Sequence, residues 1–200
     1  MDGIVNKFNG RVFVDFLSKE ECELFLAFAK DTDMWADGGD PIYNNRIIHL
    51  INYKNDDDVK AKSIEVRDRI KEAIIKEYKF ENIYEDTIQI VRWYEDLFQP
   101  PHADACNPDG SDNGLTFREI GAVIYLNDNY DGGKTYYTKY GIEVTPKAGT
   151  LIMHPSDLDH NHGVTTIKGN IRYTMASFWT KDITFANVLP QQTRKRNNDN

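Results

Sequence analysis

The feature that most constrains how this chain can fold is a set of three possible metal ligands far apart in the sequence. The stretch Pro100-Pro101-His102-Ala103-Asp104 carries a histidine and an aspartate two residues apart. In an extended strand residues i and i+2 point to the same face, so His102 and Asp104 would offer their side chains to one point. If His162 comes from a neighbouring strand, two histidines and one carboxylate meet. That facial arrangement leaves coordination positions open on a non-haem Fe(II).

Two other histidines compete with His162 for the third position. His154 follows Leu151-Ile152-Met153 at a predicted strand end before a proline, and His160 lies in a polar turn. His162 begins a hydrophobic strand that we expect to pair with the strand carrying Arg172. The sequence therefore favours His162 as the distal ligand.

A strand, a tight turn at Gly169 and a second strand are predicted after His162. A hairpin about Gly169 would place Arg172 opposite Thr166, roughly 13 Å along the strand from His162. The gap between the arginine and the metal would suit a five-carbon diacid. Arg172 offers a planar fork of donors for a carboxylate, and Thr174 adds a hydroxyl on the same face.

With these motifs the sequence resembles the Fe(II)/2-oxoglutarate-dependent dioxygenases, and among them the prolyl 4-hydroxylase-like branch. The resemblance covers roughly Thr87 to Trp179, and its motifs occur in family order. They are the strand Ile88–Tyr94, the pair His102-x-Asp104, the Tyr-Leu-Asn strand Ala122–Asn127, the turn Gly132-Gly133-Lys134-Thr135, the strand Pro146–Leu151, and His162-x-Val164 with Arg172 ten residues after the histidine.

The resemblance implies a role for each matched residue. His102, Asp104 and His162 would be iron ligands, and Arg172 would clamp the 5-carboxylate of 2-oxoglutarate. Tyr125 matches the position whose phenol often supports that carboxylate.

The resemblance also implies an activity and its requirements. These are Fe(II), 2-oxoglutarate as co-substrate, O2 and accompanying ascorbate, with release of succinate and CO2. The branch points to peptidyl proline as the target, so the expected partner is a peptide or protein substrate, including Pro-rich ones.

Two departures from the family pattern concern aromatic residues. Where many relatives have one tyrosine, this chain has Trp93 beside Tyr94, and either could approach the co-substrate. Phe178 and Trp179 stand where relatives commonly have a single aromatic residue, which leaves open the face that Trp179 occupies.

Helical patterns come early in the chain and strands come later, without regular alternation, so the fold class is α+β. Residues 11–16 and 47–51 read as strands, and His49 is more often a core or edge residue than a ligand. Ser18 and Glu21 form a capping box before the first helix. The family resemblance makes the later strands a double-stranded β-helix, or jelly roll, buttressed by the N-terminal helices.

The second helix is predicted over Val59–Tyr78. Asp56, Asp57 and Asp58 precede it as an N-cap with negative charge near the positive helix end. Its expected buried stripe consists of Ile64, Ile70, Ile74 and Ile75.

Length and charge limit the remaining possibilities. At 200 residues the chain is expected to form one domain over residues 1–190, with a catalytic core at about 87–180 and a disordered polar tail at 191–200. The net charge of −8 argues against nucleic acid as a partner. No apolar run reaches the ~20 residues of a membrane span, and no signal peptide pattern is present, so a cytoplasmic location is expected. Nothing in the sequence sets the oligomeric state.

Three functions remain open on sequence alone. The leading one is hydroxylation of peptidyl proline, the second is the same chemistry on a free amino acid or nucleobase, and the third is a non-catalytic β-sandwich binding module. Two polar loops flank the expected site, Trp35–Arg46 and Asn107–Gly114. The second is either a substrate lid or a plain surface loop.

Overall fold

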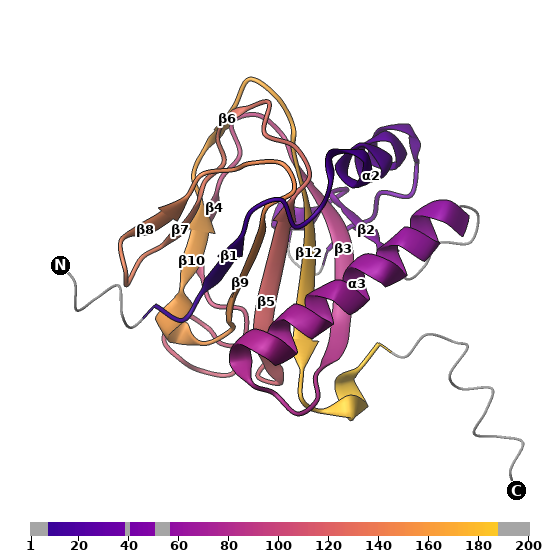
Figure 1. Cartoon of the computed structure of the whole chain (residues 1–200). Helices are drawn as coiled ribbons and strands as arrows, with labels where there is room; N and C mark the ends of the chain where they lie inside the picture. The colour runs from indigo at the N-terminus through magenta and orange to yellow at the C-terminus, as the bar shows by residue number, and fades with distance from the viewer. Residues whose placement is uncertain (1–7, 39–40, 51–56, 188–200) are drawn as a thin grey trace, which may run out of the picture.

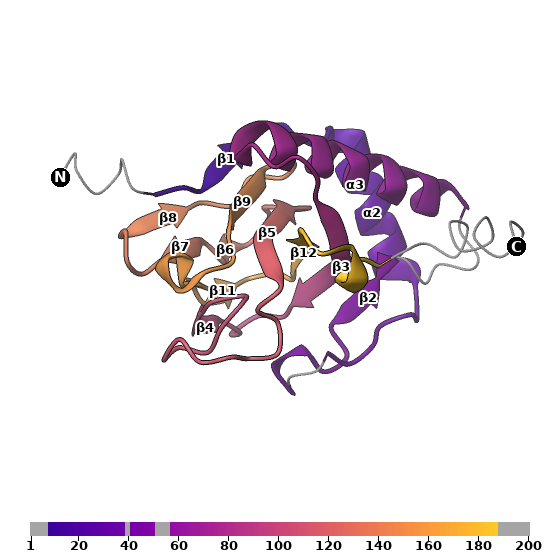
Figure 2. The ribbon, with the colours of Figure 1, turned by 90° about the horizontal axis from the view of Figure 1, so that it is seen from below.

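Two antiparallel sheets face each other in the computed structural model, which describes residues 8–38, 41–50 and 57–187 (Figures 1 and 2). Within these residues the larger sheet has six strands, in the order β1 (Arg11–Phe13), β9 (Leu151–Pro155), β5 (Arg118–Tyr125), β12 (Arg172–Thr180), β3 (Tyr84–Trp93) and β2 (Ile47–His49). The smaller sheet has the order β4 (Gln99–His102), β10 (His162–Val164), β7 (Thr135–Tyr137) and β8 (Ile142–Val144). A short separate ladder pairs β6 (Asp131–Gly132) with β11 (Ile167–Lys168).

Two helices, α2 (Lys19–Asp31) and α3 (Asp57–Tyr78), cover the outer face of the larger sheet, as Figure 2 shows. The predicted capping box of α2 is present, because the Ser18 side chain accepts from the Glu21 amide and the Glu21 side chain accepts from the Ser18 amide. Cys22, Phe25 and Ala29 are the buried residues of this helix. The expected α+β fold with buttressing helices is confirmed. No helix in the described part of the chain is long and apolar enough to cross a membrane.

The buried stripe of α3 differs from the expected one. Its buried apolar residues are Val59, Val66, Ile70 and Ile74. These four residues are spaced 7, 4 and 4 positions apart, so they form one stripe along the helix. Ile64 and Ile75 lie beside this stripe and are only partly buried. The predicted acidic cap falls largely outside the described residues, which exclude Asp56 and the side chain of Asp57.

Successive side chains of strand β12 point alternately to the helix side of the larger sheet and to the space between the two sheets. Tyr173, Met175 and Trp179 pack in the cluster shared with the helices. Arg172, Thr174, Ala176 and Phe178 line the space between the two sheets. Trp179 is fully buried, and its Nε1 donates to Ser177 Oγ at 3.0 Å, so it belongs to the helix-side core and Phe178 faces the site.

The predicted hairpin about Gly169 is wrong. β10 lies in the smaller sheet and β12 in the larger one, and Arg172 is in register with Trp93 rather than with Thr166. Gly169 does make a tight turn, with φ of +83°, but this turn carries the chain from β11 of the short ladder to β12 of the larger sheet. A local turn signal does not fix which sheet the next strand joins, because that depends on long-range pairing with β3 and β5.

Both early strands are shorter than expected. β1 ends at Phe13, and Asp15 two residues later has a φ of 55°, which an extended strand cannot accommodate. β2 ends at His49, and Ile51 lies outside the described residues. The loop after α2 carries a 3-10 turn, Pro41–Tyr43, and a bridge between Ala36 and Ile47.

Candidate functional site

His102 and His162 lie side by side on neighbouring strands. β4 and β10 are antiparallel, and His102 is in direct register with His162. The two ring centroids are 4.5 Å apart. One donor atom from each of His102, Asp104 and His162 lies within 4.8 Å of the others, so the three predicted ligands converge.

Asp104 reaches this point from a bend rather than from a strand. β4 ends at His102, two residues earlier than the alternation argument requires. The bend is fixed by its neighbours, since Ala105 N donates to Ser156 O at 3.0 Å and Asn113 Nδ2 donates to Asp104 O at 3.4 Å. Asp104 Oδ1 lies 3.7 Å from His102 Nε2. Asp104 therefore joins the converging set as expected, although the geometry that brings it there differs.

The surroundings set the protonation states that a metal requires. Burial, reinforced by His154, lowers the pKa of His162 to about 3, so this imidazole is neutral at physiological pH. Burial alone would raise the pKa of Asp104, but the imidazoles of His162, His154 and His102 outweigh it and hold the pKa below its usual value. A neutral imidazole and an ionised carboxylate bind a metal without first losing protons.

These three residues fit an Fe(II) ion. Two imidazole nitrogens and one carboxylate form the donor set of non-haem Fe(II) oxygenases, which leaves positions open for other ligands. Asp104 Oδ2 is also buried without a hydrogen-bond partner among the described residues. A buried carboxylate of this kind needs a cation or a hydrogen-bond donor nearby to offset the cost of its burial.

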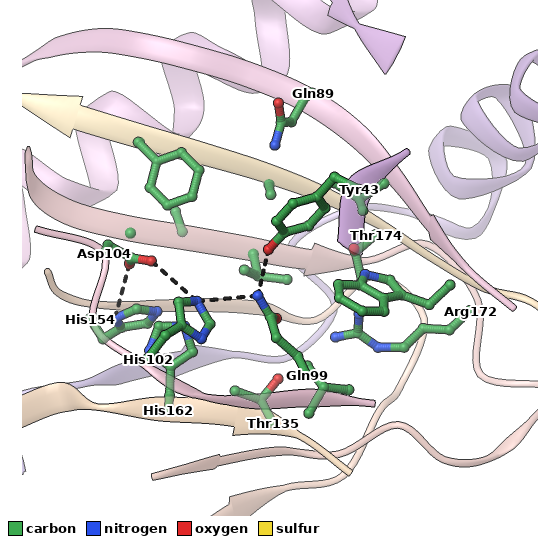
Figure 3. Close-up of a pocket in the computed structure, with 18 residues that line it drawn as sticks. Tyr43, Gln89, Gln99, His102, Asp104, Thr135, His154, His162, Arg172 and Thr174 are labelled. Atoms are coloured by element: carbon green, nitrogen blue, oxygen red, sulfur yellow. Dashed lines mark hydrogen bonds and ion pairs between the residues drawn. The ribbon is translucent and has the colours of Figure 1, made fainter. Parts of the chain in front are cut away.

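Arg172 lies at the opposite end of the same pocket (Figure 3). It is 2% exposed, its Nε donates to Gly133 O at 3.2 Å, and it forms no salt bridge with any described residue. Gly133 has a φ of +61°, and a Cβ there would lie 3.1 Å from Arg172 Cδ, so glycine allows this close approach. A buried, permanently charged guanidinium without an acidic partner is suited to an anionic ligand.

The two other predicted co-substrate residues differ in position. Thr174 is 2% exposed and lines the pocket beside Arg172. Tyr125 is fully buried, its ring lies 5.2 Å from the Arg172 guanidinium carbon, and its hydroxyl is 2.7 Å from Thr135 Oγ1. Thr135 lines the pocket, so Tyr125 is placed to support the arginine and the threonine from behind.

The metal ligands join two hollows. The inner pocket, of about 70 Å³, lies between the sheets and runs from the three ligands to Arg172. An outer groove of about 740 Å³ includes His102 and Asp104 and extends past Asp37, His49, Asn113 and Arg118. Both predicted flanking loops therefore contribute to the groove, and the metal site is accessible from it.

Tyr43 and Gln99 were not identified as site residues from the sequence, and the choice between Trp93 and Tyr94 was left open. Trp93 lines the inner pocket, with Tyr43 in edge contact at 5.6 Å between centroids, whereas Tyr94 is 38% exposed. Gln99 Nε2 donates to the Tyr43 hydroxyl and lies 3.3 Å from His102 Nε2. In Figure 3 the Gln99 side chain lies between the metal ligands and Arg172. Strand alternation could not have indicated Gln99, because it lies three residues before His102 and a period of two would place it on the opposite face.

The competing histidines occupy different places. His160 lies in the 3-10 turn Leu158–His160, where its Nδ1 is 2.6 Å from Asp157 Oδ1, and it is not part of the converging set. His154 is not part of that set either, but it lines the pocket, which the sequence did not indicate. His49 is partly buried at the sheet edge and lines the outer groove.

Comparison with known proteins identifies the family. Residues 88–180 match the model of the 2OG-Fe(II) oxygenase superfamily. Prolyl 3-hydroxylase 2 of Mus musculus is 32% identical over 99 residues, which are 44% of this chain and 14% of that relative. The chain thus matches only a small part of the curated relative's length.

Solved structures share the fold at low sequence identity. A Pseudomonas putida prolyl-4-hydroxylase superposes with a TM-score of 0.67 at 18% identity, covering 90% of this chain and 96% of the other. A prolyl hydroxylase in complex with a hypoxia inducible factor peptide fragment, from Trichoplax adhaerens, has a TM-score of 0.66 at 16% identity, covering 89% and 86%. The matched family model and the converging ligands together show that residues 88–180 form a 2OG-Fe(II) oxygenase domain with prolyl hydroxylase-like neighbours.

Proposed function

We propose that this enzyme hydroxylates proline residues within a polypeptide. The observation that carries the proposal is the arrangement of two hollows that meet at the metal ligands. The inner one ends at a buried arginine, and the outer one is an open groove. A small diacid and a long substrate can therefore approach one metal from different directions.

The inner pocket is suited to 2-oxoglutarate. Arg172 would bind the 5-carboxylate with its terminal nitrogens while its Nε stays on Gly133 O. Thr174 would add a hydroxyl donor, and Tyr125 would hold Thr135 and the guanidinium in place. Gln99 would have to turn aside, because its amide lies across this path.

His102, Asp104 and His162 would hold Fe(II) where the hollows meet. With Fe(II) and 2-oxoglutarate bound, one oxygen atom of O2 enters a substrate C–H bond, the other enters succinate, and CO2 is released. The chain's own residues orient both reactants and limit access of water, since the pocket is lined by Trp93, Val164 and Ala176 as well as by polar groups.

The outer groove supports a peptide substrate. At about 740 Å³ it is far larger than one free amino acid requires, and Tyr43 and Phe178 offer aromatic surfaces beside the metal ligands. A Pro-rich segment is already extended and loses little conformational entropy on docking. Asp37 is exposed on the groove, and the net charge is −8, so basic residues flanking the proline are favoured.

The names of the relatives support a proline substrate, but they name different carbons of the proline ring as the one that is hydroxylated. The sequence relative is by name a prolyl 3-hydroxylase, and a structural relative is by name a prolyl-4-hydroxylase. The ring carbon is therefore an outcome of the experiment. The same chemistry on a free amino acid or nucleobase is the competing function.

The test is mass spectrometry of Pro-rich peptides incubated with the enzyme, Fe(II), 2-oxoglutarate and ascorbate. A gain of one oxygen atom on proline is expected, with fragmentation and NMR locating the carbon. Free proline should be a poor substrate, and peptides with Lys or Arg flanks should exceed those with Glu flanks. Succinate formation stimulated by a free amino acid or nucleobase, with none stimulated by any proline peptide, would overturn the substrate and leave the iron chemistry standing.

A further inference from the structure

His154 is a fourth histidine at the metal centre that the ligand set does not explain. It is the fourth residue of β9, in register with Gly121 of β5. Its side chain is 1% exposed, and its ring centroid lies 4.3 Å from that of His162. It is nevertheless outside the converging set of three donors. A buried imidazole here is placed to act on a ligand rather than on the metal.

The ligand that faces His154 is Asp104, and its two carboxylate oxygens have different surroundings. Oδ1 lies 3.7 Å from His102 Nε2, on the side where the ligands converge. Oδ2 lies 3.9 Å from His154 Nδ1 and has no hydrogen-bond partner among the described residues. Figure 3 shows the His154 ring beside this carboxylate, away from Arg172.

The hydrogen position on His154 follows from its other neighbour. Nδ1 is 3.1 Å from Pro155 O. A carbonyl oxygen can only accept a hydrogen bond, so the proton belongs on Nδ1. The same N–H can therefore be shared with Asp104 Oδ2 once the carboxylate or the ring moves by less than an ångström, from 3.9 Å to an ordinary hydrogen-bond distance of about 3 Å.

Gly121 makes room for this pair. A Cβ at this position would lie 2.4 Å from Asp104 Oδ2 and 2.9 Å from His154 Cε1. Its φ is not in the left-handed region, so space rather than backbone conformation requires glycine. Both strands of the β5–β9 pair thus contribute to a close contact between the carboxylate and the imidazole.

We infer that His154 is a positioning residue that donates a hydrogen bond from Nδ1 to Oδ2 of Asp104. With Oδ2 held, the carboxylate presents Oδ1 alone to the metal. Binding through one oxygen uses one coordination position instead of two, which keeps the remaining positions open for co-substrate and O2. Groups that orient metal ligands in this way typically change metal affinity by about 10–100-fold when they are replaced.

The test compares replacements that keep or remove the donor. His154→Asn keeps an N–H donor at the δ position, and His154→Leu has nearly the same shape as asparagine without one. His154→Phe keeps an aromatic ring and removes both nitrogens. Met153→Leu is the control, because Met153 is the adjacent residue of β9 and packs in the helix-side core.

Each purified full chain is titrated anaerobically with Co(II), which reports both affinity and, through its visible absorption, coordination geometry. We expect His154→Leu and His154→Phe to weaken binding by about 10-fold or more and to change the spectrum. His154→Asn should stay within about threefold of wild type with a wild-type spectrum, as should Met153→Leu. The thermal unfolding midpoint of each metal-free variant separates metal effects from loss of fold.

Two results would overturn the inference. Equal weakening by His154→Asn and His154→Leu would show that only the shape of the imidazole matters. Unchanged affinity and spectrum in all three variants would show that His154 does not position Asp104. Neither readout involves a peptide, so failure here is separate from failure of the proposed substrate, and the inference rests on the metal centre alone.

Discussion

Replacing Arg172 by alanine is predicted to abolish tight 2-oxoglutarate binding while leaving the metal in place. The guanidinium is 2% exposed and has no acidic partner among the described residues. It stays charged when buried, so the bound carboxylate would be its only counter-ion. Breaking one partner of such a pair costs about 3–5 kcal/mol. Since each 1.4 kcal/mol is a factor of ten, the dissociation constant should rise by at least about 100-fold.

The assay is calorimetric titration of 2-oxoglutarate into the Fe(II)-loaded protein under anaerobic conditions. Arg172→Lys should recover only part of the affinity, because a point charge lacks the fork that matches a carboxylate. Arg172→Met removes the charge and keeps much of the volume, so it should not destabilise the metal-free protein. Arg11→Ala, on the edge strand β1, is the matched control and should bind normally.

Two outcomes would refute this reasoning. Binding of 2-oxoglutarate by Arg172→Ala within about threefold of wild type would mean that another residue clamps the carboxylate. Loss of Fe(II) together with 2-oxoglutarate would mean that Arg172 supports the metal centre instead.

Two further predictions concern neighbouring side chains. Phe178→Ala should raise the KM for a proline peptide with little change in stability. Trp179→Ala should lower the free energy of unfolding by about 3–5 kcal/mol in urea titrations. The reverse pattern would contradict the assignment of Phe178 to the site and of Trp179 to the helix-side core. Burial raises the pKa of Glu85 to about 7 from 4.5, so its contribution to stability is fully present below pH 4.5 and is lost as pH rises through 7. Glu85→Gln should therefore stabilise the protein at pH 8 by about 1–3 kcal/mol and have little effect at pH 4, and an equal effect at both pH values would refute this.

The sequence predicted the ligands better than the path that brings them together. His102, Asp104 and His162 converge as expected because their identities and spacing are constrained by the metal. The strand expected to carry Asp104 ends at His102, and the strands expected to pair about Gly169 lie in different sheets. Turn geometry is local, but the choice of sheet depends on contacts with segments more than 40 residues away, such as β5 and β3.

The buried face of a helix or strand could be predicted only where one hydrophobic spacing holds along the whole element. The apolar residues of α3 were assigned partly to the wrong face, because Ile64 and Ile75 compete with the stripe of Val66 and Ile70 in an otherwise charged helix. His154 was judged only as a possible ligand. Its alternation with Ile152 along β9 could have placed it between the sheets, but its closeness to Asp104 depends on the space left by Gly121.

The central claim is that three side chains hold one Fe(II), and anaerobic Fe(II) titration of wild type beside Asp104→Ala tests it most directly. Asp104 supplies the only anionic donor of the converging set, and none of the three ligands belongs to a hydrophobic cluster of the described residues. Wild type should bind one Fe(II) per chain at micromolar metal. Asp104→Ala should fold and bind none, while Asp109→Ala, in the exposed loop beyond it, should bind as wild type does. Equal Fe(II) affinity in wild type and Asp104→Ala would contradict the assignment of the site.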